Sequence, residues 1–216
     1  SLPIGEAQGK ALGTVTLDLL TLNVFGLPKP IGKNIKERSV RIGSSLGSYH
    51  IMGLQETFSK DTQAIKQTAN QLGMNLNGFK PTAHRLGNSG LTTLSPYEIA
   101  EQDFQPFVFA SSADSLAKKG VTFVRLKVPE VGFVDVYNTH YQADGDREKS
   151  PTQKFLSRLA SFILPGFDMS KELIRLHDNQ VLINLFRKHD QGYPTFFLGD
   201  FNTGEKSRVY QDLVSQ

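Results

Sequence analysis

A short apolar run that ends in two polar side chains constrains this chain more than any other feature. Residues Thr195–Asn202 read Thr-Phe-Phe-Leu-Gly-Asp-Phe-Asn and follow Gly192 and Pro194. Their length and aromatic content predict a buried strand, and alternation along it places Asp200 and Asn202 on one side of the chain. This stretch alone is consistent with a polar β-turn or with a functional site at the end of a sheet.

Three further predicted strands end in polar side chains in the same way. They are Val15–Val24 with Asn23, His50–Glu56 with Gln55 and Glu56, and Phe133–Gln142 with Asn138, His140 and Gln142 on one face. Taken singly, each has an ordinary structural role: Asn23 as a cap or turn residue, His140 as a hydrogen-bonded strand residue, and Glu56 as a carboxylate paired with a base or water. Their repetition favours the alternative in which the strand ends meet.

Hydrophobic periodicity and turn residues predict the other elements. Helices are expected over Ile35–Tyr49, Ser59–Leu72, Phe155–Leu164 and Ser170–His189, and a helix or loop over Thr203–Gln216. A Gly-rich turn with a strand broken at Pro96 is expected over Gly87–Ile99, an irregular strand over Asp103–Phe109, and a hairpin that joins Val121–Val128 to Phe133–Gln142. A chain of 216 residues can bury one sizeable core, so we expect a single domain over residues 1–216.

Composition limits the chemistry. The chain has no cysteine, which excludes disulfides, thiolate zinc sites and cysteine nucleophiles, so any metal must be held by oxygen or imidazole ligands. The sequence contains no run of 18 apolar residues, so it predicts no transmembrane segment. The net charge is only +3, but a basic cluster fits either a solvated helix face or a rim that attracts phosphate. Its members are Lys29, Lys33, Lys36, Arg38 and Arg41.

The four strand ends together supply Asn23, Glu56, His140, Asp200 and Asn202. Oxygen donors with one imidazole suit Mg²⁺ or Mn²⁺ beside a bound phosphate better than they suit zinc. Glu56 fits the role of a metal-binding carboxylate, the two amides and His140 could donate to phosphate oxygens, and Asp200 could orient or deprotonate a water molecule. The set therefore predicts phosphoryl-transfer chemistry.

Five stretches, in this order along the chain, resemble the motifs of the endonuclease/exonuclease/phosphatase superfamily, whose fold is that of deoxyribonuclease I. They are Thr-Leu-Asn-Val-Phe-Gly-Leu-Pro (21–28), Gly-Leu-Gln-Glu (53–56), Asn-Ser-Gly-Leu-Thr-Thr-Leu-Ser (88–95), Tyr-Asn-Thr-His-Tyr-Gln-Ala (137–143) and Gly-Asp-Phe-Asn (199–202). Within that superfamily, the first and fourth stretches and Lys-Lys-Gly-Val (118–121) are most similar to neutral sphingomyelinases.

The resemblance implies an α/β (α+β) four-layer sandwich, in which two mixed β-sheets face each other with helices outside, and a Mg²⁺-dependent phosphodiesterase that could also use Mn²⁺. It implies that Glu56 and Asn23 bind the metal, that His140, Asp200 and Asn202 are catalytic, and that Asn23, His140 and Asn202 contact the substrate. The implied substrate is a phosphodiester with a phospholipid headgroup, reached by peripheral contact with a membrane. A nuclease or an inositol-phosphate phosphatase of the same superfamily is the alternative.

One departure from the family pattern concerns the general acid or base. The family ends in a Ser-Asp-His motif, and none follows Asn202, while His177 and His189 precede Gly-Asp-Phe-Asn. We therefore expect either a C-terminally incomplete domain that lacks the last strands of the second sheet, or a natural short form that binds phosphate or a headgroup with impaired catalysis. The chain begins with Ser1 without a visible signal peptide, and a secreted or extracytoplasmic location is the favoured expectation.

Overall fold

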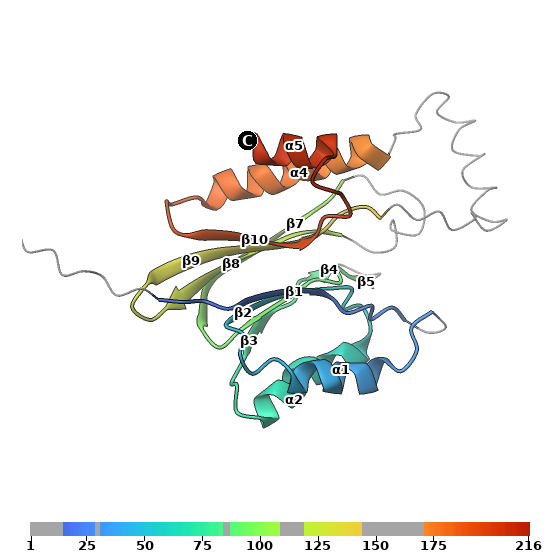
Figure 1. The fold of residues 1–216 in the computed structure, drawn as a ribbon, viewed down its shortest axis with the longest axis vertical. Coiled ribbons are helices and arrows are strands. Elements are labelled where there is room, and N and C mark those ends of the chain that lie inside the picture. Colours follow the sequence, from blue (N-terminus) through green and yellow to red (C-terminus); the bar gives the residue numbers. More distant parts are fainter. Residues whose placement is uncertain (1–14, 29–30, 84–86, 109–118, 144–170) are drawn as a thin grey trace, which may run out of the picture.

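Two four-stranded β-sheets lie face to face at the centre of the structure, and helices cover the outer side of each sheet (Figure 1). This computed structural model describes residues 15–28, 31–83, 87–108, 119–143 and 171–216. Each sheet contains both parallel and antiparallel strand pairs. The layers confirm the predicted α/β (α+β) sandwich of two mixed sheets flanked by helices.

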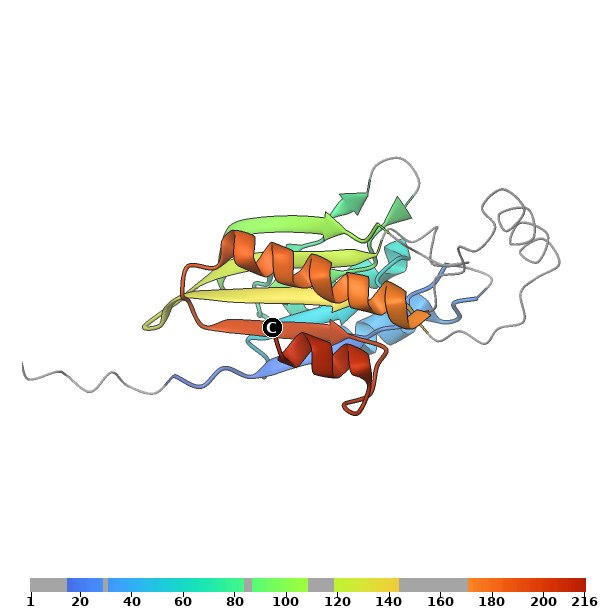
Figure 2. The same cartoon turned by 90° about the horizontal axis from the view of Figure 1, so that it is seen from above.

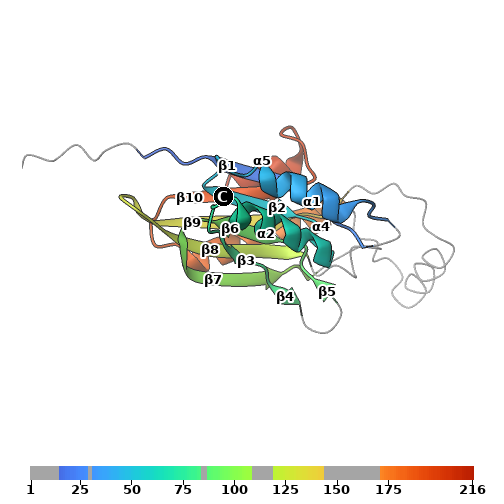
Figure 3. The ribbon, with the colours of Figure 1, turned by 90° about the horizontal axis from the view of Figure 1, so that it is seen from below.

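The first sheet has the strand order β1-β2-β6-β3. Its strands are β1 (Leu19–Asn23), β2 (Ile51–Gln55), β6 (Thr92–Ser95) and β3 (Asn77–Phe79). The helices over its outer side (Figure 3) are α1 (Ile35–Ser44), the 3₁₀ turn η1 (Lys60–Gln63) and α2 (Ala64–Gln71). β1 and β2 run parallel with Asn23 opposite Gln55. Leu54, Ile65 and Leu94 are buried between sheet and helices, as expected of short apolar strands covered by an amphipathic helix.

The second sheet has the order β10-β9-β8-β7. Its strands are β10 (Thr195–Asp200), β9 (Gly132–His140), β8 (Gly120–Val128) and β7 (Glu98–Pro106). The helices over its outer side (Figure 2) are α4 (Lys171–His189) and α5 (Arg208–Val214), and a separate ribbon pairs β4 (Thr82–Ala83) with β5 (Gly87–Asn88). β9 and β10 run parallel with His140 opposite Asp200, whereas β8 and β9 form the predicted antiparallel hairpin.

Apolar side chains fill the space between the two sheets, and a polar contact crosses it. Ile51 of the first sheet packs in one cluster with Val136 and Leu198 of the second. The Gln55 amide nitrogen donates to Asn138 Oδ1 at 2.8 Å, and both side chains are buried. Because a buried amide that loses its partner costs free energy, this hydrogen bond favours one register of the sheets over its alternatives.

Helix α1 departs from its predicted length and face. It ends at Ser44 rather than Tyr49, and Val40, one of the apolar residues that predict this helix, is 41% exposed. The helix buries Gly43 instead, where an added Cβ would lie 2.4 Å from the Ile65 carbonyl oxygen. Close approach of the α1 and α2 backbones therefore decides which face is buried, and hydrophobic periodicity does not reveal it.

Strand β7 also differs from its prediction. The irregular strand expected over Asp103–Phe109 starts earlier, at Glu98, and is continuous with the segment after Pro96. A shift in register between Ile99 and Glu101 breaks the alternation of the sequence there. The predicted helix Phe155–Leu164 lies outside the described residues. None of the helices in the described ranges is both long and apolar enough to span a bilayer.

The close contact between the sheets at Gly53 gives the first prediction. An added Cβ at this position would lie 3.0 Å from Leu198 Cβ and 3.2 Å from Asn138 Cγ, both atoms of the facing sheet. We expect Gly53→Ala to lower the free energy of unfolding by about 1–3 kcal/mol, because overpacking forces the sheets apart. Urea denaturation measures this loss.

Gly47→Ala is the matched control, since nothing lies within 4 Å of an added Cβ at that exposed position. This variant should change stability by no more than about 0.5 kcal/mol. Equal stability of the two variants would show that the sheets are not in close contact at Gly53.

Candidate functional site

The polar ends of β1, β2, β9 and β10 meet at one edge of the sandwich. Each sheet contributes one parallel pair, and Asn23 lies opposite Gln55 as His140 lies opposite Asp200. Across the interface β1 packs against β10 and β2 against β9. Because the carboxyl ends of parallel strands share an edge, this packing gathers side chains that are far apart in the sequence, including Glu56 directly after β2.

The Asn23 side chain is the centre of the cluster. Its amide nitrogen donates to Glu56 Oε1 at 3.0 Å and to Asp200 Oδ2 at 3.1 Å, while its own oxygen accepts from the Phe25 backbone N–H at 3.0 Å. His140 Nε2 lies 3.8 Å from the same Asp200 oxygen. Asn23 therefore bridges a carboxylate of the first sheet and a carboxylate of the second.

Asn202 belongs to the cluster through backbone contacts. Its backbone N–H donates to Asp200 Oδ1 at 3.1 Å, and its side-chain nitrogen donates to the Tyr141 carbonyl oxygen at 3.1 Å. The side-chain amide of Asn202 thus holds the chain next to Tyr141, which follows His140, and its backbone N–H orients the Asp200 carboxylate. The structure brings together all five residues that the sequence singles out, although the Asn202 nitrogen is directed at the protein backbone.

Backbone strain is concentrated at the same edge. Phe25, Glu56 and Asn202 have φ angles of 48°, 57° and 47°, in the left-handed region that side chains with a Cβ disfavour. Each follows a strand of the cluster. The Gly26 backbone N–H donates to the Glu56 carbonyl at 2.9 Å and holds the turn after β1 against the residue after β2. Strain of about 1 kcal/mol per residue is retained where it aims side chains at a common point.

Glu56 carries the clearest sign of a missing partner. Its Oε2 atom is buried and makes no hydrogen bond, while Oε1 accepts from Asn23. A buried carboxylate oxygen without a donor costs about 1–3 kcal/mol or more, so the position favours a bound cation. The described residues contain no group of three or more His, Cys, Asp or Glu side chains that could hold a metal unaided. One or two carboxylates with amide oxygens, water and substrate oxygens suit Mg²⁺, and the cluster fits that donor set.

Comparison with known proteins identifies the family of the chain. The family model of the Endonuclease/Exonuclease/phosphatase family matches residues 20–216. The chain belongs to this family. A sphingomyelinase of Mycobacterium tuberculosis is 30% identical over 152 residues, which are 67% of this chain and 30% of that protein. The chain thus spans 30% or less of the length of the curated relatives that it matches.

Two solved structures show the same fold as this family member. Sphingomyelinase C of Streptomyces griseocarneus has a TM-score of 0.67 at 19% identity and covers 91% of this chain, with 67% of its own chain matched. A beta toxin variant of Staphylococcus aureus with bound magnesium ions has a TM-score of 0.70 at 16% identity, with 91% and 68% covered. At these identities the likeness concerns the fold.

In this endonuclease/exonuclease/phosphatase domain, two arginines of the basic cluster defined above bind other groups of the protein. Arg38 on α1 donates to the Val24 and Phe25 carbonyl oxygens at 3.2 and 2.8 Å, so it holds the turn that follows Asn23. Arg41 is exposed and pairs with Glu37. The sequence does not reveal this role of Arg38, because the two carbonyl groups come within its reach only when α1 packs on the sheet.

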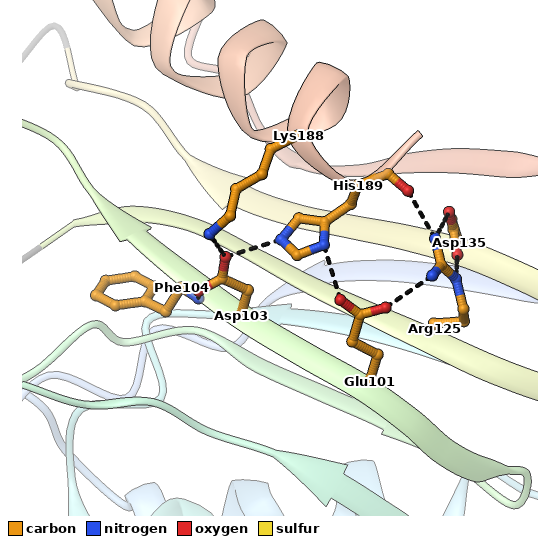
Figure 4. Close-up of polar contacts among 7 residues, drawn as sticks. All are labelled: Glu101, Asp103, Phe104, Arg125, Asp135, Lys188 and His189. Atoms are coloured by element: carbon orange, nitrogen blue, oxygen red, sulfur yellow. Dashed lines mark hydrogen bonds and ion pairs between the residues drawn. The ribbon is translucent and has the colours of Figure 1, made fainter. Parts of the chain in front are cut away.

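A second polar network lies under the end of α4, on the outer side of the second sheet (Figure 4). His189 Nδ1 lies 2.9 Å from Glu101 Oε1, and its Nε2 lies 2.8 Å from Asp103 Oδ2. Arg125 pairs through two nitrogens with Asp135 at 2.8 and 2.9 Å and also donates to the His189 carbonyl at 2.7 Å. These bonds fasten the last turn of α4 to β7, β8 and β9.

This network is remote from the functional edge. Asp135 precedes His140 by five positions on β9, which is roughly 17 Å along a strand. His189, which contacts Arg125 beside Asp135, therefore cannot act on a phosphate at His140. The structure agrees with the expectation that His189 does not replace the family's Ser-Asp-His histidine.

The network makes acid stability depend on Asp103. Burial opposes ionisation, but hydrogen bonds from Lys188, His189 and the Phe104 backbone N–H, with the Lys188 charge, lower the pKa of Asp103 from 3.8 to about 2. A lowered folded pKa stabilises the protein above the unfolded pKa, and this contribution is lost as pH falls from about 4 to 2. We expect Asp103→Asn to unfold at lower urea concentration than wild type at pH 6, with the gap closing over that interval.

Glu98→Gln is the control for this experiment, because it removes a negative charge from the same strand without touching the network. Urea midpoints of the three proteins between pH 6 and 2 provide the measurement. A gap between wild type and Asp103→Asn that is the same at pH 6 and pH 2 would contradict the assigned stabilisation.

Proposed function

We propose that this chain hydrolyses a phosphodiester with the help of Mg²⁺, with Mn²⁺ as a substitute, and that its substrate is a sphingomyelin-type phospholipid. The observation that carries the proposal is the meeting of Glu56, Asp200 and His140 around Asn23, with a buried Glu56 oxygen that lacks a donor. The lipid substrate is supported by the sphingomyelinase relatives.

Glu56 and Asn23 would hold the metal. Glu56 offers the buried oxygen Oε2, and the Asn23 amide, whose nitrogen donates to Oε1 of the same carboxylate, would offer its oxygen to the metal once rotated. When bound, Mg²⁺ would neutralise negative charge on the phosphate oxygens and favour attack at phosphorus. The backbone of Glu56 is strained, with φ 57°. Such strain fits a residue whose carboxylate has a function, because it lowers the stability of the fold.

The remaining side chains have complementary roles. The His140 side chain is 5% exposed and its Nε2 lies 3.8 Å from Asp200 Oδ2, so it can donate to a phosphate oxygen that develops charge beside Asp200. Asp200 is more accessible, with 34% of its side chain exposed, and can accept a proton from water or orient it. Asn202 and Asn23 would keep Asp200 in place, and each also offers an amide to substrate oxygens once rearranged.

A second candidate function rests on one observation. Among the described residues, the contacts described above for Asn23, Glu56 and Asp200 include one imidazole, that of His140, whereas His189 belongs to the network under α4. A domain that binds a phosphate or headgroup with slow turnover is the corresponding alternative, since loss of a general acid or base typically costs about 10²–10⁴ in rate. Nuclease activity within the same family is the other alternative.

Hydrolysis of sphingomyelin in mixed micelles, followed by phosphocholine release, tests the proposal. We expect activity with Mg²⁺, loss of activity with EDTA, and a fall of about 10²–10³-fold in Glu56→Gln, because several kcal/mol of charge stabilisation disappear. Glu37→Gln is the matched control, since Glu37 is exposed and pairs with Arg41, away from the cluster.

Unchanged turnover in Glu56→Gln would refute the assignment of the site. Cleavage of DNA but not of sphingomyelin, with the same dependence on Glu56, would retain the site and replace the substrate by nucleic acid.

Metal binding can be measured apart from turnover. We expect Mg²⁺ to raise the melting temperature of wild type and to leave that of Glu56→Gln unchanged, since a ligand stabilises only the state that binds it. In EDTA, Glu56→Gln should melt no lower than wild type, because the substitution removes a buried charge whose Oε2 has no donor. Differential scanning calorimetry gives both comparisons. An equal Mg²⁺ shift in both proteins would place the metal elsewhere.

A further inference from the structure

A cavity of about 330 Å³ lies on the outer side of the first sheet, between η1 and α2 on one side and β3 and β6 on the other. Its lining includes Thr57, the residue that follows Glu56. Its lining consists of Leu54, Thr57, Thr62, Gln63, Ile65, Lys66, Gln67, Gly78, Lys80, Thr92 and Leu94. This volume is typical of sites for small ligands.

The charged side chains that line the cavity are all positive. Lys66 and Lys80 line it, and no aspartate or glutamate does. Within the described part of the chain, neither ammonium group forms an ion pair with a carboxylate. Lys80 is half-buried, its Nζ donates to the Thr57 carbonyl oxygen, and burial lowers its pKa. An amine removed from water without a counter-ion favours an anion beside it.

The other lining groups are threonines with engaged hydroxyl groups, an apolar floor, and the exposed side chains of Gln63 and Gln67. Thr57 donates to the Gly90 carbonyl and Thr62 to the Ser59 carbonyl, so these hydroxyl hydrogens are engaged. Leu54, Ile65 and Leu94 are almost fully buried and form the floor. The two lysines are therefore the charged groups available to a ligand, beside the amides of Gln63 and Gln67 and the apolar floor.

We propose that this cavity binds a small organic phosphate, whose phosphate group lies between Lys66 and Lys80 and whose apolar part rests on Leu54, Ile65 and Leu94. Two cations without a carboxylate match a group that carries close to two negative charges. A cavity of about 330 Å³ holds an aryl or short alkyl group but not a two-chain lipid. The proposal goes beyond the proposed function, because it involves neither the metal nor the catalytic side chains.

Isothermal titration of the whole chain with phenyl phosphate in EDTA tests the proposal. We expect one site per chain, with affinity lower by roughly fivefold or more in Lys66→Gln and in Lys80→Met. Lys80→Met keeps the apolar stem of the side chain, and Lys66→Gln keeps the hydrogen-bonding capacity of a partly exposed residue on α2. Inorganic phosphate should bind more weakly than phenyl phosphate, and neutral benzyl alcohol more weakly still.

Two controls distinguish binding in this cavity from binding elsewhere on the chain. Lys60→Gln removes a lysine from η1 outside the cavity and should leave the affinity unchanged. Glu56→Gln should also leave it unchanged, whereas loss of binding in that variant would place phenyl phosphate at the catalytic edge and overturn the proposal.

Three other results would also overturn the proposal. Equal weakening by Lys60→Gln and Lys66→Gln would indicate unspecific attraction to surface charge, and preferential binding to phosphatidate vesicles would indicate a membrane surface instead of a soluble ligand. The third is the absence of binding at millimolar phenyl phosphate. If sphingomyelin hydrolysis fails while phenyl phosphate binds with these dependences, the proposed function is wrong and the cavity assignment stands.

Discussion

The hydrogen bonds of the Asn23 amide hold the functional edge together. One nitrogen bridges Glu56 and Asp200, which come from different sheets, and the Asn23 oxygen accepts from the turn that follows β1. Two carboxylates on facing sheets repel each other unless a donor or a cation lies between them. The Asn23 amide is therefore the side-chain donor that joins the two carboxylates until a cation binds, and the roles assigned to His140 and Asp200 depend on it.

The sandwich supplies the force that keeps these groups in place. Apolar side chains between the sheets, Ile51 with Val136 and Leu198 among them, fix how the parallel pair of one sheet lies over that of the other. The buried hydrogen bond between Gln55 and Asn138 fixes the position of one sheet relative to the other more closely than apolar packing alone. Unfavourable backbone angles and an unpartnered carboxylate oxygen collect at the edge, where the stable layers can offset their cost.

Much of this arrangement follows from the sequence, because an apolar run followed by polar residues marks a strand that ends at a site. The four strands, the order of the elements and the proximity of Asn23, Glu56, His140 and Asp200 could be predicted in that way. What could not be predicted depends on contacts between distant segments. Arg38 looks like a surface base until α1 docks, Gly43 is buried only because α2 comes close, and the lysine cavity exists only between α2 and β6. The roles of the site residues, the extracytoplasmic location and the completeness of the domain stay predictions.

The most direct test of metal binding at this edge is anomalous diffraction from crystals soaked in Mn²⁺. We expect an anomalous peak about 2.1 Å from Glu56 Oε2, within reach of Asn23 and on the same edge as Asp200 and His140. Absence of a peak at Glu56, with manganese found instead beside Glu101 and Asp103 or nowhere in the crystal, would contradict the proposed site.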